Sequence, residues 1–312
     1  MRVLVTGASG FLGRYFLEYL ILQGVHDIWS VDKVPHPDNV PIVVEDLVSF
    51  LDDFDEEMDL VIHMAGPVGG RVVIESDPLF NADALRLDSA LFRWAAKHAK
   101  HVVYPSSSAV YPVENQVAGE AIPLAESLFH PDHGQWGRPD EMYGFTKLAG
   151  EVLAWTAARY GVSTLVIRPF SGYGPGQSYD YPVPSIVRRA VLREDPIAIW
   201  GPPTTQRDFI YVTDIVKRTM ALATSFTGMR TVNLGSGNPI DFATVARVAA
   251  EIVGYSPEIE HQWGRPKGVD QRWASIERMD RMLIRQDYEE PLVDLRTGLA
   301  RVVEAVRKDV LP

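Results

Sequence analysis

Short runs of apolar and β-branched residues alternate with longer amphipathic stretches through the first two-thirds of the chain. The short runs predict strands at 3–6, 28–31, 42–44, 60–63, 101–104 and 164–168. In the first long stretch, Leu12, Phe16 and Leu20 share one helical face, so a helix is expected from about residue 11 to residue 24. Further helices are expected over 78–99, 141–160, 183–194, 213–225, 241–253 and 292–309. This order predicts an α/β fold with a doubly wound parallel sheet.

The regular alternation breaks at the Gly-, Pro- and Tyr-rich segment 171–181, SGYGPGQSYDY. A smaller second domain is expected to begin there. The strand-like TVNLG at 231–235 predicts a return to the main sheet. The domains are therefore expected to comprise 1–174, rejoined by 205–235, and a discontinuous substrate domain of 175–204 and 236–312.

Composition narrows the class of protein. Of 312 residues 46% are hydrophobic, which excludes a disordered chain. The net charge of −11 excludes a broad basic surface for nucleic acid or an anionic membrane, so an anionic ligand needs a local arginine cluster. The absence of cysteine excludes disulfides, thiolate nucleophiles and cysteine-ligated metals. Because neither a signal peptide nor an apolar run of about 20 residues is visible, a cytoplasmic location is expected.

Glycines at 7, 10 and 13 follow the first predicted strand and open the first helix. In this GxxGxxG turn, glycines permit a pyrophosphate to approach the helix N-terminus, although such a turn by itself also serves simple packing. Asp32 ends the second strand 19 residues after Gly13, where a carboxylate binds the ribose hydroxyls and repels a 2′-phosphate. These features predict a Rossmann-type domain that binds NAD. Lys33 is the one feature that favours NADP.

Further cofactor contacts are expected where other strands end. Asp46 and Leu47 follow the third strand and are predicted to meet the adenine, with a helix N-cap as the alternative role of Asp46. The remaining predicted cofactor residues are Phe11, Leu12, Met64, Ala65, Gly66 and Pro169.

Tyr143 and Lys147 are candidates for catalysis. They lie four residues apart in a predicted helix and so on one face. A tyrosine has an ordinary pKa near 10, and an adjacent cation favours its phenolate, which makes Tyr143 a candidate general base. The alternative is an amphipathic helix with a surface lysine. Ser107, in the serine run after the fifth strand, is placed to hydrogen-bond a reacting oxygen, although three serines also suit a loop.

Seven motifs in order carry a resemblance over nearly the whole chain. They are TGASGFLG, Asp32, SSSAVYP, YGFTK, RPFSGYGPGQ at 168–177, RDFIYVTD at 207–214 and NLGSG at 233–237. The chain resembles the extended short-chain dehydrogenase/reductases, and among them the nucleotide-sugar epimerases and dehydratases. The resemblance implies tightly held NAD, and a homodimer formed through the helices at 78–99 and 141–160.

The resemblance also implies the roles of individual residues. Tyr143 is implied as the base, Lys147 as its partner and a ribose ligand, and Ser107, three residues before Val110, as the hydroxyl that aligns the substrate. Substrate contacts are further expected from Ser108, Ser171, Arg207, Asn233 and Arg265. Among these, the two arginines are implied to meet a nucleotide diphosphate, and Ser171 replaces the family's usual asparagine.

Residues that the chain lacks disfavour several of the reactions that the resemblance would allow. The family's 4,6-dehydratases carry Asp-Glu directly after the catalytic Ser or Thr, where this chain has Ser108 and Ala109, and its decarboxylases usually carry a glutamate in that stretch. Local similarity to GDP-mannose 3,5-epimerases is visible at 68–70 and 140–151, but the cysteine used in that chemistry is replaced by Ala109. C4 epimerisation of a UDP-, dTDP-, CDP- or GDP-linked sugar is therefore expected.

Two alternatives stay open, a 4-ketoreductase or dehydrogenase and a non-catalytic dinucleotide-binding scaffold. His130 and His133 are assigned to a solvated loop rather than to a metal site, because no third spaced ligand completes one. No bound metal is expected.

Overall fold

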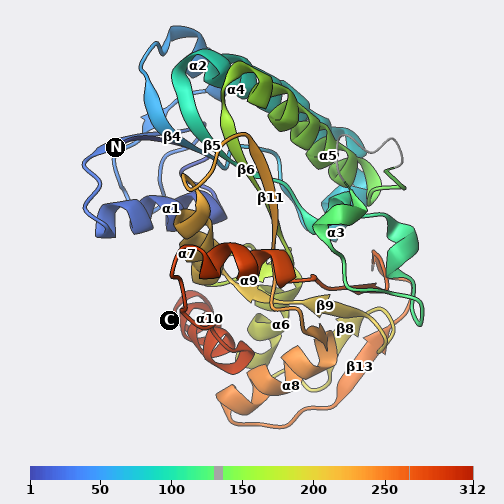
Figure 1. Ribbon diagram of the computed structural model, residues 1–312. Helices are drawn as coiled ribbons and strands as arrows, with labels where there is room; N and C mark the ends of the chain where they lie inside the picture. The colour runs from blue at the N-terminus through green and yellow to red at the C-terminus, as the bar shows by residue number, and fades with distance from the viewer. Residues whose placement is uncertain (130–135, 267, 312) are drawn as a thin grey trace.

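A computed structural model describes residues 1–129, 136–266 and 268–311 (Figure 1). Its centre is a seven-stranded sheet in the order β11-β6-β5-β4-β1-β2-β3, in which every pairing is parallel. The strands are β1 (Arg2–Thr6), β2 (Asp27–Asp32), β3 (Val43–Val44), β4 (Met58–His63), β5 (Ala99–Pro105), β6 (Ser163–Pro169) and β11 (Met229–Leu234). The order of the sheet reverses at β1, which is the topology of a Rossmann fold, and the predicted fold class is confirmed.

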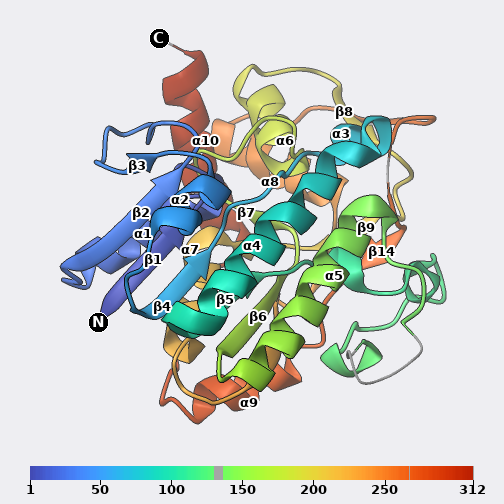
Figure 2. The same ribbon diagram turned by 90° about the horizontal axis from the view of Figure 1, so that it is seen from above.

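Helices cover both faces of the sheet. Successive strand residues point to opposite faces, and both sets are apolar, so each face needs a covering layer. Val3 and Val5 pack under α1 (Phe11–Leu22) and α7 (Val212–Leu222). Leu4 packs on the other side, under α2 (Leu47–Asp53), α4 (Asp83–His98) and α5 (Glu141–Ala157). Figure 2 shows α4 and α5 side by side across that face. The strands are buried from both sides, which explains why their sequences are continuous apolar runs.

A second lobe has its own apolar core, and Figure 1 shows it below the sheet. Three helices enclose this core: α6 (Pro182–Val191), α8 (Phe242–Val253) and α10 (Leu295–Val310). Short strands complete the lobe and its junction with the sheet: β7 (Gly172–Tyr173), β8 (Ile197–Trp200), β9 (Gln206–Asp208), β10 (Ile210–Tyr211), β12 (Pro239–Asp241), β13 (Ile259–Gln262) and β14 (Gln271–Arg272).

The predicted strands and helices of the sheet are present, with three differences. The helix expected over 78–99 is divided into a 3₁₀ turn at Pro78–Ala82 and α4. Three short helices were not predicted, α2, α3 (Arg71–Ser76) and α9 (Glu277–Ile284). Met279 and Leu283 of α9 pack into the core beneath the main sheet, so part of the segment expected in the substrate domain covers the main sheet. In the part of the chain that the structure describes, no helix is long and apolar enough to cross a bilayer.

Candidate active site

The glycine turn after β1 is packed so tightly that side chains are excluded. Gly7 has φ +68°, and a Cβ there would lie 2.4 Å from the backbone of Met64 and Ala65 at the end of β4. A Cβ on Gly13 would lie 2.0 Å from the Gly7 carbonyl oxygen. Gly10 caps α1 without a side-chain hydrogen bond, so the helix N-terminus presents backbone N–H groups. This cradle fits a pyrophosphate.

Asp32 lies at the edge of this turn. Its carboxylate accepts hydrogen bonds from the Ser9 amide at 3.0 Å and the Val34 amide at 3.3 Å. The side chain is half-buried beside the glycine turn, where it fits the ribose of NAD, whereas Lys33 is exposed. The other expected residues of this region, Phe11, Leu12, Met64, Ala65, Gly66 and Pro169, are all partly exposed.

Asp46 and Leu47 both have structural partners. Asp46 caps α2 by accepting a hydrogen bond from the Val48 amide at 3.0 Å, and it pairs with Arg86 at 2.9 Å. Leu47 is buried and packs in the core with Phe50. The alternative role of Asp46 as a helix N-cap is observed, because its carboxylate accepts a hydrogen bond in the first turn of α2, and the contact with the adenine stays a prediction.

Tyr143 and Lys147 lie in the first turns of α5. Lys147 is only 5% exposed, and its ammonium lies over the ring of Tyr104, 5.6 Å from the ring centroid. Among the described residues, it forms neither a hydrogen bond nor an ion pair with another side chain. A buried ammonium requires polar partners. The ribose hydroxyls of NAD and the oxygen of Tyr143 are groups of the right chemistry.

Ser107 is the accessible member of the serine run. It is half-buried, whereas Ser106 and Ser108 are buried. Its hydroxyl oxygen accepts a hydrogen bond from the Ala109 amide at 3.1 Å, at the start of a 3₁₀ turn. The Ala109 carbonyl in turn accepts from the Asp140 amide at 2.8 Å, and Gly144 packs against it. These contacts bring the serine turn against the part of α5 that carries Tyr143.

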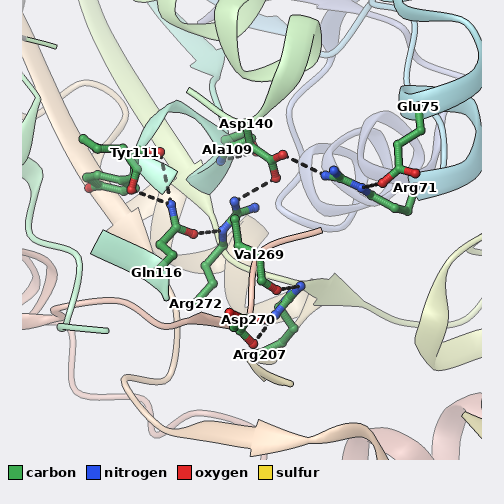
Figure 3. Close-up of polar contacts among 12 residues, drawn as sticks. Arg71, Glu75, Ala109, Tyr111, Gln116, Asp140, Arg207, Val269, Asp270 and Arg272 are labelled. Carbon is green, nitrogen blue, oxygen red and sulfur yellow. Dashed lines mark hydrogen bonds and ion pairs between the residues drawn. The ribbon is translucent and has the colours of Figure 1, made fainter. Parts of the chain in front are cut away.

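Arg207 lies between β9 and the segment before β14. Its guanidinium donates to the carbonyl oxygens of Gln206, Val269 and Asp270 at 2.7, 2.7 and 3.1 Å (Figure 3). Burial, reinforced by repulsion from Arg272, lowers the pKa of Arg207 to about 9. A bound anion would relieve this electrostatic cost, so the position suits the expected diphosphate.

Two arginines at this site were not predicted from the sequence. Arg71 of α3 and Arg272 of β14 both bind the carboxylate of Asp140, at 2.8 and 2.9 Å. Figure 3 shows Asp140 between the two guanidinium groups. The sequence offers little signal for this cluster, because its members lie far apart along the chain. The one local hint is Asp140, three residues before Tyr143.

The structure does not bring every predicted substrate residue together. Asn233 is completely buried; its amide donates to the carbonyl oxygens of Leu124 and Ser275, and its oxygen accepts from the Tyr111 hydroxyl. Protein groups use both ends of its amide, so the structure gives no support to the prediction that Asn233 binds substrate. Arg265 is exposed and lies over the ring of Trp200.

The remaining predictions concern Ser171 and the histidines. Ser171 is half-buried and lies two residues after the end of β6. His130 and His133 lie outside the described residues. Within the described ranges, no group of three or more His, Asp or Glu side chains could hold a metal ion.

Comparison with known proteins agrees with this geometry. The sequence model of the NAD dependent epimerase/dehydratase family matches residues 3–235. The chain is 26% identical to UDP-glucuronate 4-epimerase of Thermodesulfobacterium geofontis, over 98% of this chain and 96% of the relative. It is 27% identical to dTDP-4-dehydro-6-deoxy-D-allose reductase of Streptomyces bikiniensis, over 95% of this chain and 93% of the relative.

Solved structures show the same fold. MoeE5 in complex with UDP-glucose and NAD has a TM-score of 0.79 and 27% identity, over 99% of this chain and 100% of that chain. UDP-glucuronic acid 4-epimerase from Bacillus cereus, at 24% identity, has a TM-score of 0.82 over 99% of each chain. The expected family and the expected cofactor, NAD, are confirmed. Because the family model matches residues 3–235, which is most of the chain, the protein belongs to the NAD dependent epimerase/dehydratase family of enzymes.

Proposed function

We propose that the protein is a nucleotide-sugar 4-epimerase in which Tyr143 is the acid–base residue. The observation that carries the proposal is the Lys147 ammonium, buried one helical turn from Tyr143 and without a carboxylate partner among the described residues. A cation in that position stabilises a tyrosinate. Ser107 lies against the same helix turn and offers the hydroxyl that orients the substrate.

In the proposed reaction, Tyr143 removes the proton from the 4-hydroxyl of the sugar, while Lys147 stabilises the phenolate. Ser107 donates a hydrogen bond to the same sugar oxygen and holds it in place. Bound NAD, which the glycine turn at Gly7–Gly13 and Asp32 would hold, would supply the hydride acceptor and donor for C4. After the keto sugar turns over in the pocket, Tyr143 gives the proton back to O4. The product then differs from the substrate only in its configuration at C4.

Ala109 argues against chemistry at C3, C5 or C6. It is 3% exposed, and both its amide and its carbonyl are used by neighbouring protein groups. Its methyl group cannot transfer a proton, so this position supplies no second acid or base. A 4-ketoreductase needs the same three residues as an epimerase, and the Streptomyces bikiniensis relative is named as a reductase. It is the second candidate.

The substrate proposed first is a UDP-linked sugar. MoeE5 is solved with UDP-glucose, and the Thermodesulfobacterium geofontis relative is named as a UDP-glucuronate 4-epimerase. In this chain Arg207 is assigned to the diphosphate because its guanidinium is held by backbone carbonyls in a cationic cluster. Arg265 is a second proposed diphosphate ligand, which requires its exposed side chain to turn from Trp200 towards the site.

A cytoplasmic homodimer is the proposed assembly. The exposed face of α5 carries Phe145, which is 47% exposed, and α4 runs beside α5. An apolar side chain on the outer face of a helix pair suits a contact with a second copy. Light scattering coupled to size-exclusion chromatography measures the mass directly, and Phe145→Glu is expected to shift a dimer to monomer.

Proton NMR of UDP-sugars incubated with enzyme and trace NAD in deuterated water tests the reaction. Inversion at C4 with retention of its original hydrogen supports epimerisation. Deuterium at C3 or C5, or turnover that requires stoichiometric reduced cofactor, contradicts it. Tyr143→Phe is expected to lower kcat by about 10²- to 10⁴-fold while NAD remains bound. Near-normal turnover in that variant would remove Tyr143 from the mechanism.

A further inference from the structure

Asp140 joins three separate parts of the chain at the point where α5 begins. Its Oδ1 accepts a hydrogen bond from Arg71 of α3 at 2.8 Å, and its Oδ2 accepts one from Arg272 of β14 at 2.9 Å (Figure 3). Arg71 follows the β4 end of the main sheet, whereas Arg272 pairs in the small sheet with β9. One carboxylate therefore ties the catalytic helix to both sides of the site.

Each guanidinium is held a second time. Arg71 also donates to Glu75 at 2.6 Å, and Arg272 donates to the Gln116 side chain at 2.5 Å. Gln116 is buried, and its amide nitrogen donates in turn to the carbonyl oxygens of Tyr111 and Pro112. The Nε of each arginine is thus bound to a second side chain, which restrains both guanidinium groups if Asp140 moves. We call Asp140, Arg71 and Arg272 together the clamp. Both arginines of the clamp are thus held by residues outside α5.

The clamp acts on the helix turn that carries Tyr143. The Asp140 amide donates to the Ala109 carbonyl at 2.8 Å, and its carbonyl accepts from the Gly144 amide at 2.9 Å. Tyr143 lies within that turn and interacts electrostatically with Arg272. Between Asp140 and Tyr143, Glu141 has φ +57°, a left-handed conformation that costs about 1–2 kcal/mol for a residue with a side chain. The start of this helix therefore needs outside contacts to hold its shape.

Asp140 is charged at neutral pH. Burial opposes its ionisation, but the attraction of Arg272 and Arg71 and their hydrogen bonds hold the pKa of this carboxyl below its usual value. Replacement by asparagine keeps the size and one acceptor oxygen but removes the second charge-assisted bond. The charge of the clamp can thus be removed with little change in shape.

We propose that Asp140 is a positioning residue that fixes Tyr143 at the reacting hydroxyl by clamping the first turn of α5 between Arg71 and Arg272. The inference rests on the proposed role of Tyr143 as the acid–base residue. Asp140 itself does not transfer a proton to substrate. A displacement of about 1 Å at a reacting group costs up to about 10²-fold in rate, so a loose clamp should lower turnover and leave binding intact.

The first test is steady-state kinetics of Asp140→Asn on the nucleotide sugar identified by NMR. The expected result is a kcat lower by about 10- to 100-fold, with KM within about threefold and bound NAD unchanged. The matched control is Asp294→Asn, since Asp294 also caps a helix, accepting from Thr297 at 2.9 Å, but lies on α10. Its turnover should equal that of the unchanged protein. A kcat within twofold for Asp140→Asn, or a change in KM alone, overturns the proposal.

The second test asks whether Asp140 acts through Tyr143. A single-turnover assay follows the formation of reduced nicotinamide by absorbance. Asp140→Asn should lower the rate of this step when Tyr143 is present, but should not lower it further in a protein that already carries Tyr143→Phe. An equal loss in both backgrounds indicates general damage and overturns the proposal. Where Asp140→Asn does not fold, Arg272→Gln takes its place in the same comparison. If Tyr143→Phe keeps full activity, the proposed function fails instead, and the two failures are thus distinguished.

Discussion

Two carboxylates bind arginine at helix α5, one in the helix and one directly before it, and their surroundings differ. Glu151, in the body of the helix, forms a bidentate pair with Arg168, with donor–acceptor distances of 2.8 and 2.7 Å and both side chains 0% exposed. Asp140, at the start of the helix, shares its two oxygens between Arg71 and Arg272, whose side chains are 23% and 11% exposed. The Glu151–Arg168 pair is completely buried, whereas the cluster of Asp140, Arg71 and Arg272 is partly exposed where the two lobes meet.

The buried pair is completed by further hydrogen bonds. Ser106 also donates to Glu151, and Arg168 donates to the Tyr111 hydroxyl at 2.9 Å. The Arg168 guanidinium lies between the rings of Tyr111 and Phe129, with centroids 4.8 and 5.2 Å away. Burial works against the charge of Arg168, but Glu151 and Tyr111 more than compensate and raise its pKa.

The two clusters combine the same groups, carboxylate and guanidinium, but the buried Glu151 pair stabilises the fold whereas the Asp140 cluster is assigned to positioning Tyr143. Two charges withdrawn from water are tolerated only when every donor and acceptor is satisfied, so the Glu151 pair leaves no group for a ligand. The Asp140 cluster joins segments from both lobes and keeps partial access to solvent. Loss of the Glu151 pair should lower the stability of the fold, and loss of the Asp140 cluster should lower kcat.

The largest expected effect is that of Glu151→Gln on stability. The substitution leaves the Arg168 guanidinium buried without its counter-charge, so the free energy of unfolding should fall by about 3–5 kcal/mol. Urea denaturation followed by tryptophan fluorescence measures the change. Asp140→Asn is the matched comparison and should cost clearly less, because both of its arginines reach solvent. Equal losses for the two variants would remove the distinction drawn between these clusters.

Replacement of Arg168 by lysine should have the next largest effect. Lysine keeps the charge but loses the bidentate geometry and the stacking between two rings, so a loss of about 1.5–3 kcal/mol is expected. Arg272→Lys should be milder in the same denaturation experiment. A tolerated Arg168→Lys substitution would show that charge alone, without planar geometry, holds the buried cluster.

Acid should weaken the clamp within a defined range. The pKa of Asp140 is lowered from 3.8 in the folded protein, so its contribution to stability is complete above that value and is lost as the pH falls below it. The difference in unfolding free energy between the unchanged protein and Asp140→Asn should thus stay constant from about pH 5 to 8 and narrow at lower pH. Denaturant titrations at several pH values measure it. A difference that changes near pH 7 would point to another group.

The smallest effect is expected at an exposed carboxylate–arginine pair. Asp46→Ala removes both the N-cap of α2 and the contact with Arg86, and the loss of the cap should cost about 1 kcal/mol. If the helix cap is the only role of Asp46, NAD affinity measured by calorimetry should be unchanged. A clear loss of affinity would support the predicted contact of Asp46 with the adenine.

Local spacing was sufficient to predict the glycine turn after the first strand and the helix that carries Tyr143 and Lys147. The glycines of the first turn must follow one another along the chain, because the same backbone segment forms the turn and the helix N-terminus. Tyr143 and Lys147 share a helix face for the same reason, since their separation in sequence sets their separation in space. Strands that are buried on both faces have continuous apolar sequences, and these runs are sufficient to predict the parallel sheet.

The tertiary structure alone decided which polar residues meet across the chain. Asn233 and Arg272 are both polar residues near strand ends, yet packing places the first in a closed hydrogen-bond network and the second in the cluster beside Tyr143. Nothing in local spacing distinguishes them, because their partners are distant in sequence. The chain by itself therefore determined the fold class and the placement of residues along one helix and one turn. Only packing of the two lobes determined the arginine cluster at Asp140, because the contacts that position it come from three separate segments.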